Sequence, residues 1–193
     1  MTKQNNGIFC IEGLWESDLR KQSTVRPILE LLRLNEGVRY IHRESATIEE
    51  LEFYISAWTQ KRYSSYPILY LAFHGDVEEI SPSRKPYDLD EIAEILGDRC
   101  HGRLVMISSC STLATDKRRL KTFLRNTSAL AICGYQNDVG WMLSTAFELL
   151  FFSELQENEF SGRGIKAIET KIRKLARSFE GLDFRIVTKQ ELG

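Results

Sequence analysis

The stretch PILYLAFHG, residues 67–75, is a nearly continuous apolar run that ends in a histidine and a glycine. A strand with one face in water alternates between apolar and polar residues, whereas a strand that is apolar at almost every position is covered on both faces. Strands of the second kind are typical of parallel sheets that lie between two layers of helices. We therefore predict that this stretch forms a central strand of an α/β sheet.

The remainder of the chain alternates between further apolar runs and amphipathic segments. We expect strands at residues 7–13, 37–44, 103–111, 128–135 and 183–188, and helices at residues 24–34, 47–62, 88–97, 115–126, 141–156 and 164–179. This alternation predicts parallel strands joined by right-handed helical crossovers. The expected fold is an α/β sandwich with a mostly parallel central sheet flanked by helices, and residues 1–193 are expected to form a single domain.

Local signals refine this outline at a few places. Gly37 follows the first predicted helix, where a glycine commonly ends a helix. Thr47, with Glu50 three residues later, predicts a capping box at the start of the second helix. The least regular stretch, DVEEISPSRKPYD at residues 76–88, is expected to be a small hairpin or a mobile loop.

Charge and hydropathy exclude several classes of protein. The formal net charge is −1 and the pI is about 6.3, so the composition indicates neither a nucleic-acid nor a membrane-surface partner. The first residues lack the apolar core and cleavage site of a secretory signal. No uninterrupted apolar stretch approaches the roughly 18 residues that a membrane span needs. We expect a cytoplasmic location.

The four cysteines are scattered along the chain, at positions 10, 100, 110 and 133. In a reducing cytosol they are expected to be free thiols, and no C-x-x-C pair indicates structural zinc. Cys100 and His101 could each bind a metal, but neighbours in sequence rarely converge on one ion. We therefore expect no metal and no cofactor, and Cys133, within a predicted strand, is interpreted as a core residue.

Two apolar runs end in potentially reactive side chains. The run YLAFHGD, residues 70–76, ends at His74, and VMISSCST, residues 105–112, ends at Cys110. Strands joined by one crossover are usually adjacent, about 4.8 Å apart, and ligands of open parallel sheets bind beyond the carboxyl ends of the strands. A thiol is a good nucleophile as the thiolate, and a nearby imidazole can take its proton. The pattern predicts a Cys–His catalytic dyad.

The neighbours of this pair also fit acyl transfer. Gly75 allows a close approach of the backbone, so its N–H and the N–H of Cys110 are candidate donors to an oxyanion. Small side chains beside the sulfur, Ser108, Ser109 and Ser111, leave space for a substrate main chain.

Each candidate residue could also have a purely structural role. A cysteine at a strand end is usually a small core residue, and a histidine beside a glycine is often a turn residue. Asp76 could orient His74 or serve as a turn residue, which we favour. Asp138 could face a basic substrate side chain or cap the helix that begins near Trp141, which we favour. The basic run of Lys117, Arg118, Arg119 and Lys121 is expected to be a solvated helix face, with an acidic partner as the alternative.

The two motifs resemble the histidine and cysteine motifs of the CHAT domain, a branch of the caspase and separase-like cysteine peptidases. The resemblance extends over residues 66–193, including the helix before the cysteine strand and the long helix after GYQNDVGW at residues 134–141. It implies a caspase-like fold and a cysteine endopeptidase without metal or cofactor, with Cys110 as nucleophile and His74 as general acid and base. Ser109 stands where many relatives carry alanine, and Gln136 lies in the loop that helps to form their substrate site.

The resemblance further implies a protein or peptide substrate and a regulatory protein partner, in bacterial or antiviral defence or in programmed cell death. Aspartate specificity is not implied, because caspases proper carry a different cysteine motif. An alternative is a catalytically inactive, peptidase-like interaction module. A flavodoxin-like ligand-binding domain is disfavoured, because IEGLWESD at residues 11–18 is not a Gly-rich phosphate loop.

Overall fold

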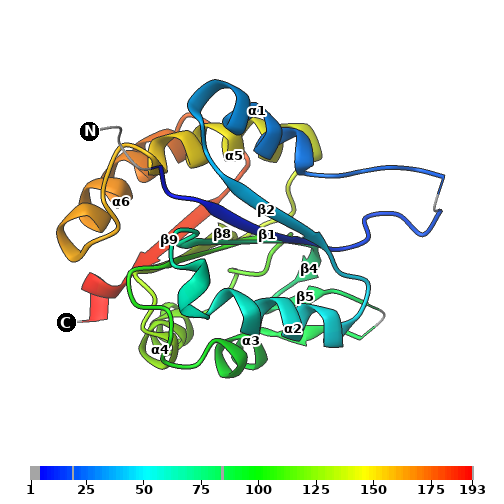
Figure 1. Ribbon diagram of the computed structural model, residues 1–193, viewed down its shortest axis with the longest axis horizontal. Coiled ribbons are helices and arrows are strands. Elements are labelled where there is room, and N and C mark those ends of the chain that lie inside the picture. Colours follow the sequence, from blue (N-terminus) through cyan, green and yellow to red (C-terminus); the bar gives the residue numbers. More distant parts are fainter. Residues whose placement is uncertain (1–4, 19, 84, 193) are drawn as a thin grey trace.

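A six-stranded sheet forms the centre of the computed structural model, which describes residues 5–18, 20–83 and 85–192 (Figure 1). The strand order is β2-β1-β3-β7-β8-β9. The bounds are β1 (Ile8–Glu12), β2 (Tyr40–Glu44), β3 (Ile68–Ala72), β7 (Leu104–Ser108), β8 (Ala131–Tyr135) and β9 (Phe184–Thr188). Every pair is parallel except β8 and β9, which are antiparallel.

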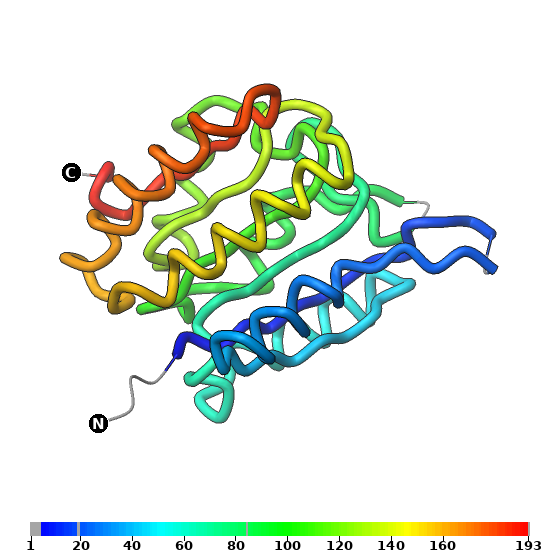
Figure 2. Tube along the Cα trace, turned by 90° about the horizontal axis from the view of Figure 1, so that it is seen from above, coloured from blue at the N-terminus to red at the C-terminus, as the bar shows by residue number. Residues whose placement is uncertain are grey.

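Helices cover both faces of this sheet. On one face lie α1 (Arg26–Glu36), α5 (Trp141–Leu155) and α6 (Gly162–Ala176), side by side in Figure 2. On the other face lie α2 (Ile48–Trp58), α3 (Leu89–Leu96) and α4 (Lys117–Thr127) (Figure 1). Short 3₁₀ turns occur at η1 (Lys61–Tyr63) and η2 (Lys189–Leu192). The predicted class, a three-layer α/β sandwich with a mostly parallel sheet, is confirmed.

The central strand β3 shows why its sequence is apolar throughout. Tyr70 points into the core formed with α1, α5 and α6, whereas Leu69 and Leu71 point into the core formed with α2, α3 and α4. All five residues of β3 are buried. Because successive side chains of a strand point to opposite faces, the residues at both odd and even positions of β3 must be apolar.

The helix ends follow the predicted signals in part. Gly37 ends α1 with φ +68°, a left-handed conformation that glycine adopts without strain. Thr47 accepts a hydrogen bond from the Glu50 N–H at 3.2 Å. The predicted reciprocal bond is wrong, because the Glu50 carboxylate accepts from the N–H of Ala46 instead, at 2.8 Å.

The stretch after the central strand departs from the simple alternation. The strand ends at Ala72, before the predicted limit at Gly75, and the chain enters a second, antiparallel sheet. This sheet consists of β4 (His74–Asp76), β5 (Glu79–Ser81) and β6 (Tyr87–Asp88). The small hairpin expected at residues 76–88 is therefore present, and it begins at the histidine itself. Within the described part of the chain, every helix is too short or too polar to cross a membrane.

Candidate active site

Cys110 lies in a tight turn just beyond the carboxyl end of β7. The next residue, Ser111, has φ +55°, and its N–H donates to the carbonyl of Asn137 at 3.2 Å. The Cys110 carbonyl accepts from the Thr112 hydroxyl at 3.2 Å. Among the described residues, none accepts a hydrogen bond from the Cys110 N–H. The turn thus holds the thiol at the edge of the sheet with a free backbone donor beside it.

The other three cysteines are unlike Cys110, because all of them are buried whereas Cys110 is half-buried. Burial raises the pKa of the Cys10 and Cys133 thiols well above the ordinary value. Burial likewise raises the pKa of Cys100 to about 12. Cys133 lies in β8, as expected for a core residue. The described residues contain no group of three or more His, Cys, Asp or Glu side chains that could hold a metal.

His74 is exposed and is held by a main-chain carbonyl. Its Nε2 lies 2.8 Å from the carbonyl oxygen of Trp15, and its ring packs edge-on against the Trp15 indole with centroids 5.1 Å apart. A carbonyl oxygen can only accept a hydrogen bond, so Nε2 is the ring nitrogen that carries the proton. In the neutral ring Nδ1 is then unprotonated and can accept a proton. Asp76 accepts from the Val77 N–H instead, so it is a turn residue, as favoured from the sequence.

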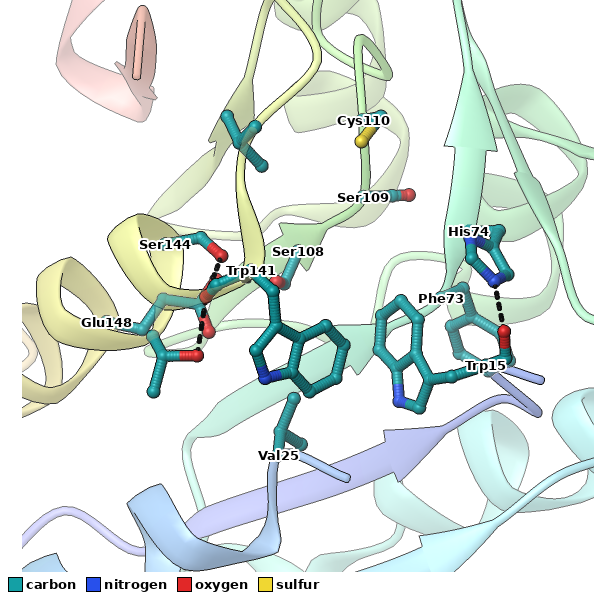
Figure 3. Close-up of a pocket in the computed structure, with 12 residues that line it drawn as sticks. Trp15, Val25, Phe73, His74, Ser108, Ser109, Cys110, Trp141, Ser144 and Glu148 are labelled. Atoms are coloured by element: carbon teal, nitrogen blue, oxygen red, sulfur yellow. Dashed lines mark hydrogen bonds between the residues drawn. The ribbon is translucent and has the colours of Figure 1, made fainter. Parts of the chain in front are cut away.

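One cavity of about 160 Å³ is lined by both His74 and Cys110 (Figure 3). It opens beyond the carboxyl ends of β3 and β7, where the sequence predicted that these side chains would converge. The other lining residues are sequence neighbours of these two or come from the segment between β1 and α1, the loop after β8 and α5. They are Trp15, Val25, Phe73, Ser108, Ser109, Val139, Trp141, Ser144, Thr145 and Glu148.

Gly75 brings the two motifs into close contact. A Cβ atom at this position would lie 2.4 Å from the Ser109 hydroxyl and 2.7 Å from the Thr112 hydroxyl and the Glu79 carbonyl. The backbone of Gly75 therefore packs directly against the turn that carries Cys110. Ser109 is buried, contacts Thr112 at 3.0 Å and lines the cavity.

Gln136 and Asp138, in the loop after β8, lie outside the cavity lining. Gln136 donates from its amide to the Asp183 carboxylate at 2.8 Å. Asp138 accepts from the Ser111 hydroxyl at 3.0 Å. The interpretation of Asp138 as a helix cap is wrong, since α5 begins after Gly140 and has no side-chain cap. Asp138 instead supports the turn beside the cysteine.

Glu148 forms the polar floor of the cavity and was not recognised from the sequence. Its carboxylate is 1% exposed and accepts from the hydroxyls of Ser108 at 2.5 Å, Tyr135 at 2.8 Å, and Tyr70. Burial raises the pKa of Glu148, although the three hydroxyl donors act in the opposite direction. The available signal was an acidic residue within the apolar run STAFELLFFSEL at residues 144–155.

Trp15 and Trp141 form an aromatic wall that was also missed. Their rings meet edge to face with centroids 4.8 Å apart. The Trp15 indole N–H donates to Glu12 at 2.5 Å, and Glu12 also accepts from Thr24 at 2.7 Å and contacts His42 Nε2 at 2.6 Å. Burial would raise the pKa of Glu12, but these hydrogen bonds outweigh it and the pKa lies below its ordinary value. Glu12 thus anchors the segment whose carbonyl holds the histidine.

The basic run on α4 is only partly a solvated face. Arg119 donates to Asp88 at 2.6 Å, to Asp90 at 3.0 Å and to Glu78. For this residue the expectation of a solvated side chain is wrong, because acidic groups around the small sheet converge on it. Lys117 pairs with Glu191, Arg118 is exposed and Lys121 is half-buried.

Comparisons with known proteins define the family and the fold. The chain belongs to a family of unknown function (DUF6642), whose model matches residues 5–187. No curated protein matches it in sequence. The crystal structure of caspase-1 from Spodoptera frugiperda is similar with a TM-score of 0.60 and 14% identity, over 97% of this chain and 89% of that one. The structure of pro-sf-caspase-1 is similar with a TM-score of 0.59 and 13% identity, over 98% and 89%. The fold is therefore caspase-like.

Proposed function

We propose that this chain is a cysteine endopeptidase of the CHAT type that cleaves protein substrates through Cys110 and His74. One observation carries the proposal: the half-buried thiol and the imidazole line the same cavity at the carboxyl edge of a caspase-like sheet. The proposal includes residues 1–193 as a single domain and a regulatory protein partner, in keeping with the resemblance of the motifs.

The arrangement supports a two-step acyl transfer. Nδ1 of His74 takes the proton of the Cys110 thiol, and the sulfur attacks the carbonyl carbon of the scissile peptide. The N–H groups of Gly75 and Cys110 stabilise the oxyanion, and the imidazolium gives its proton to the departing amine as the C–N bond breaks. Water, deprotonated by the same imidazole, then hydrolyses the thioester and restores the thiol.

The carbonyl of Trp15 has a defined role in these reaction steps. Its hydrogen bond from Nε2 fixes the tautomer with a free Nδ1, and it stabilises the imidazolium when both ring nitrogens carry protons. Ser109 is proposed to border the scissile peptide. Gln136 and Asp138 are proposed to contact substrate residues farther from the scissile bond.

Covalent labelling tests the dyad. Purified protein is incubated with a peptide carrying an acyloxymethyl ketone, and the modified residue is located by mass spectrometry. We expect one adduct, on Cys110, that is lost in C110A and forms far more slowly in H74A. C100A, which removes a buried thiol, is the matched control and should be labelled normally.

Cleavage of a native substrate separates a peptidase from an interaction module. Proteins with newly formed termini are compared between cells that express the wild-type chain and cells that express C110A. Unchanged cleavage by C110A contradicts the proposal. A biological effect that persists in the H74A/C110A double variant favours the module.

A further inference from the structure

The cavity beside the proposed dyad combines an apolar wall with a single buried acid. Figure 3 shows Trp141, Trp15 and Phe73 next to one another, and Glu148 on the side of Trp141 away from Trp15. Among the described lining residues, none is a lysine or an arginine, so no lining side chain neutralises this carboxylate as a permanent cation. A buried carboxylate without a cationic partner is costly, which makes its retention at the end of a cavity informative.

The hydrogen bonds of Glu148 leave room for one more donor. A carboxylate offers about four acceptor positions on its two oxygens. Oε1 accepts from Ser108 and Tyr135, and Oε2 accepts from Tyr70. Three of the four positions are thus used. One open position suits a single N–H of an ammonium group better than the two parallel N–H groups of a guanidinium.

The acid and the thiol lie near the same end of β7. Ser108 donates to Glu148 and lies two residues before Cys110. The Cα atoms of Ser108 and Cys110 are therefore at most about 7 Å apart. Because Glu148 and Cys110 line the same cavity, a four-carbon side chain held at Cys110 can extend from the thiol toward the acid with its stem along the aromatic wall.

We propose that Glu148 selects substrates with a lysine immediately before the scissile bond. The lysine stem packs against Trp15 and Trp141, and its ammonium donates to the open position of the Glu148 carboxylate while Ser108, Tyr70 and Tyr135 hold that carboxylate in place. This inference rests on the proposed function, since it assigns the substrate of the same site.

A set of four matched probes tests this assignment. The probes share one peptide and one acyloxymethyl ketone and differ only in the residue next to the reactive group, which is lysine, arginine, norleucine or aspartate. The rate of Cys110 modification is measured for each by mass spectrometry. We expect lysine to react at least about tenfold faster than norleucine, as a charge-assisted hydrogen bond would give, and faster than arginine, with aspartate slowest.

Variants on α5 distinguish the contribution of the Glu148 carboxylate to substrate preference from that of the rest of the pocket. E148Q should bring the ratio of lysine to norleucine rates close to one. S144K keeps the carboxylate but places an ammonium one turn before it, and should abolish the lysine preference even where E148Q fails to fold. E154Q changes an acid on the same helix outside the cavity lining and should keep the wild-type ratio.

The outcomes distinguish this inference from the proposed function. If norleucine, arginine or aspartate modifies Cys110 as fast as lysine, the lysine assignment is overturned while the cysteine peptidase stands. A lysine preference that persists in both E148Q and S144K also overturns it. If none of the four probes modifies Cys110, the proposed function fails and the substrate assignment fails with it.

Discussion

Ala72 of β3 and Ser108 of β7 are the last paired residues of two adjacent parallel strands. His74 and Cys110 each lie two residues farther along, so the paired strand ends place both residues at the same edge of the sheet. The hydrogen bond from the Phe73 N–H to the Ser108 carbonyl, at 3.2 Å, is the last link before the chains diverge. The candidate dyad is therefore a consequence of strand register, and substitutions that disturb this edge should affect it.

Replacing Gly75 by alanine should damage the site through sterics. A Cβ there would lie 2.7 Å from the Glu79 carbonyl and 2.4 Å from the Ser109 hydroxyl, so either β4 or the cysteine turn must move. We expect a loss of about 1–3 kcal/mol in the free energy of unfolding and at least about tenfold slower labelling of Cys110. G162A, where no atom lies within 4 Å of the new Cβ, is the control and should leave both quantities nearly unchanged.

The buried acid should make stability fall as the pH rises. Because the pKa of Glu148 is raised by burial, the folded state holds a proton that the unfolded state releases near its ordinary pKa. Folding is thus favoured below the ordinary pKa, and this contribution is lost as pH rises through the folded pKa. Tyr70, Tyr135, Cys10 and Cys133 also face this acid, but their pKa values are raised and they stay neutral in this range.

The measurement compares urea unfolding of the wild type and E148Q between pH 4.5 and pH 8. The stability difference between the two should change in favour of E148Q as the pH increases. Parallel profiles for the two proteins would contradict the raised pKa. The matched E154Q variant should follow the wild type.

Glu12 should show the opposite dependence on pH. Its pKa is lowered because the hydrogen bonds from His42, Thr24, Trp15 and the Val25 N–H outweigh burial. The stabilising contribution is therefore present above the ordinary pKa and is lost as the pH falls through the folded pKa. We expect E12Q to lose about 2–4 kcal/mol of unfolding free energy at pH 7 and less at pH 4, as measured by urea unfolding.

The same E12Q protein should be impaired in labelling. Glu12 holds the Trp15 segment, and the Trp15 carbonyl holds His74. The rate of Cys110 modification should fall together with a change in its pH profile, because the imidazole loses its fixed orientation. E16Q, in the same segment but on a half-buried acid that pairs with Lys21, serves as the comparison. If the labelling rate of E12Q and its pH profile match those of the wild type, Glu12 has no role in positioning His74.

Arg119 should tie the small sheet to α4. It contacts Glu78, which follows β4, and Asp88 and Asp90, at the start of α3. In R119M we expect faster amide hydrogen exchange in residues 76–88 and a loss of about 1–2 kcal/mol in unfolding free energy. R118M, which removes an exposed neighbour, should change neither; equal effects of the two substitutions would rule out this role.

The strands and their level in the sheet were predictable because they depend on local pattern. Runs whose residues are apolar on both faces of the strand indicate buried parallel strands. His74 and Cys110 were predicted as site residues because two such runs end at them. The direction of β9 was not predictable in this way, since an apolar run is equally compatible with either direction. The early end of β7 at Ser108 was not predictable either, because the turn beyond it has a positive φ at Ser111, a position without a glycine.

The pocket residues were predictable only in part, because they depend on contacts distant in sequence. Ser109 and Ser108 are next to the cysteine and were noticed. Glu148 can be recognised as a pocket residue only once Tyr70 of β3 and Tyr135 of β8 are known to lie on the face of the sheet that α5 covers. Asp138 was assigned to the nearest helix, whereas its partner is Ser111, 27 residues earlier.

The acceptor that holds the His74 imidazole is a carbonyl of the main chain, at Trp15. Every amino acid supplies that oxygen, so a scan that replaces one side chain at a time would never delete it. Amide-to-ester or proline substitutions, which move or reshape the backbone of this segment, are the changes that would expose its contribution. A genetic map of essential positions would accordingly understate how strongly the proposed site relies on the segment that follows β1.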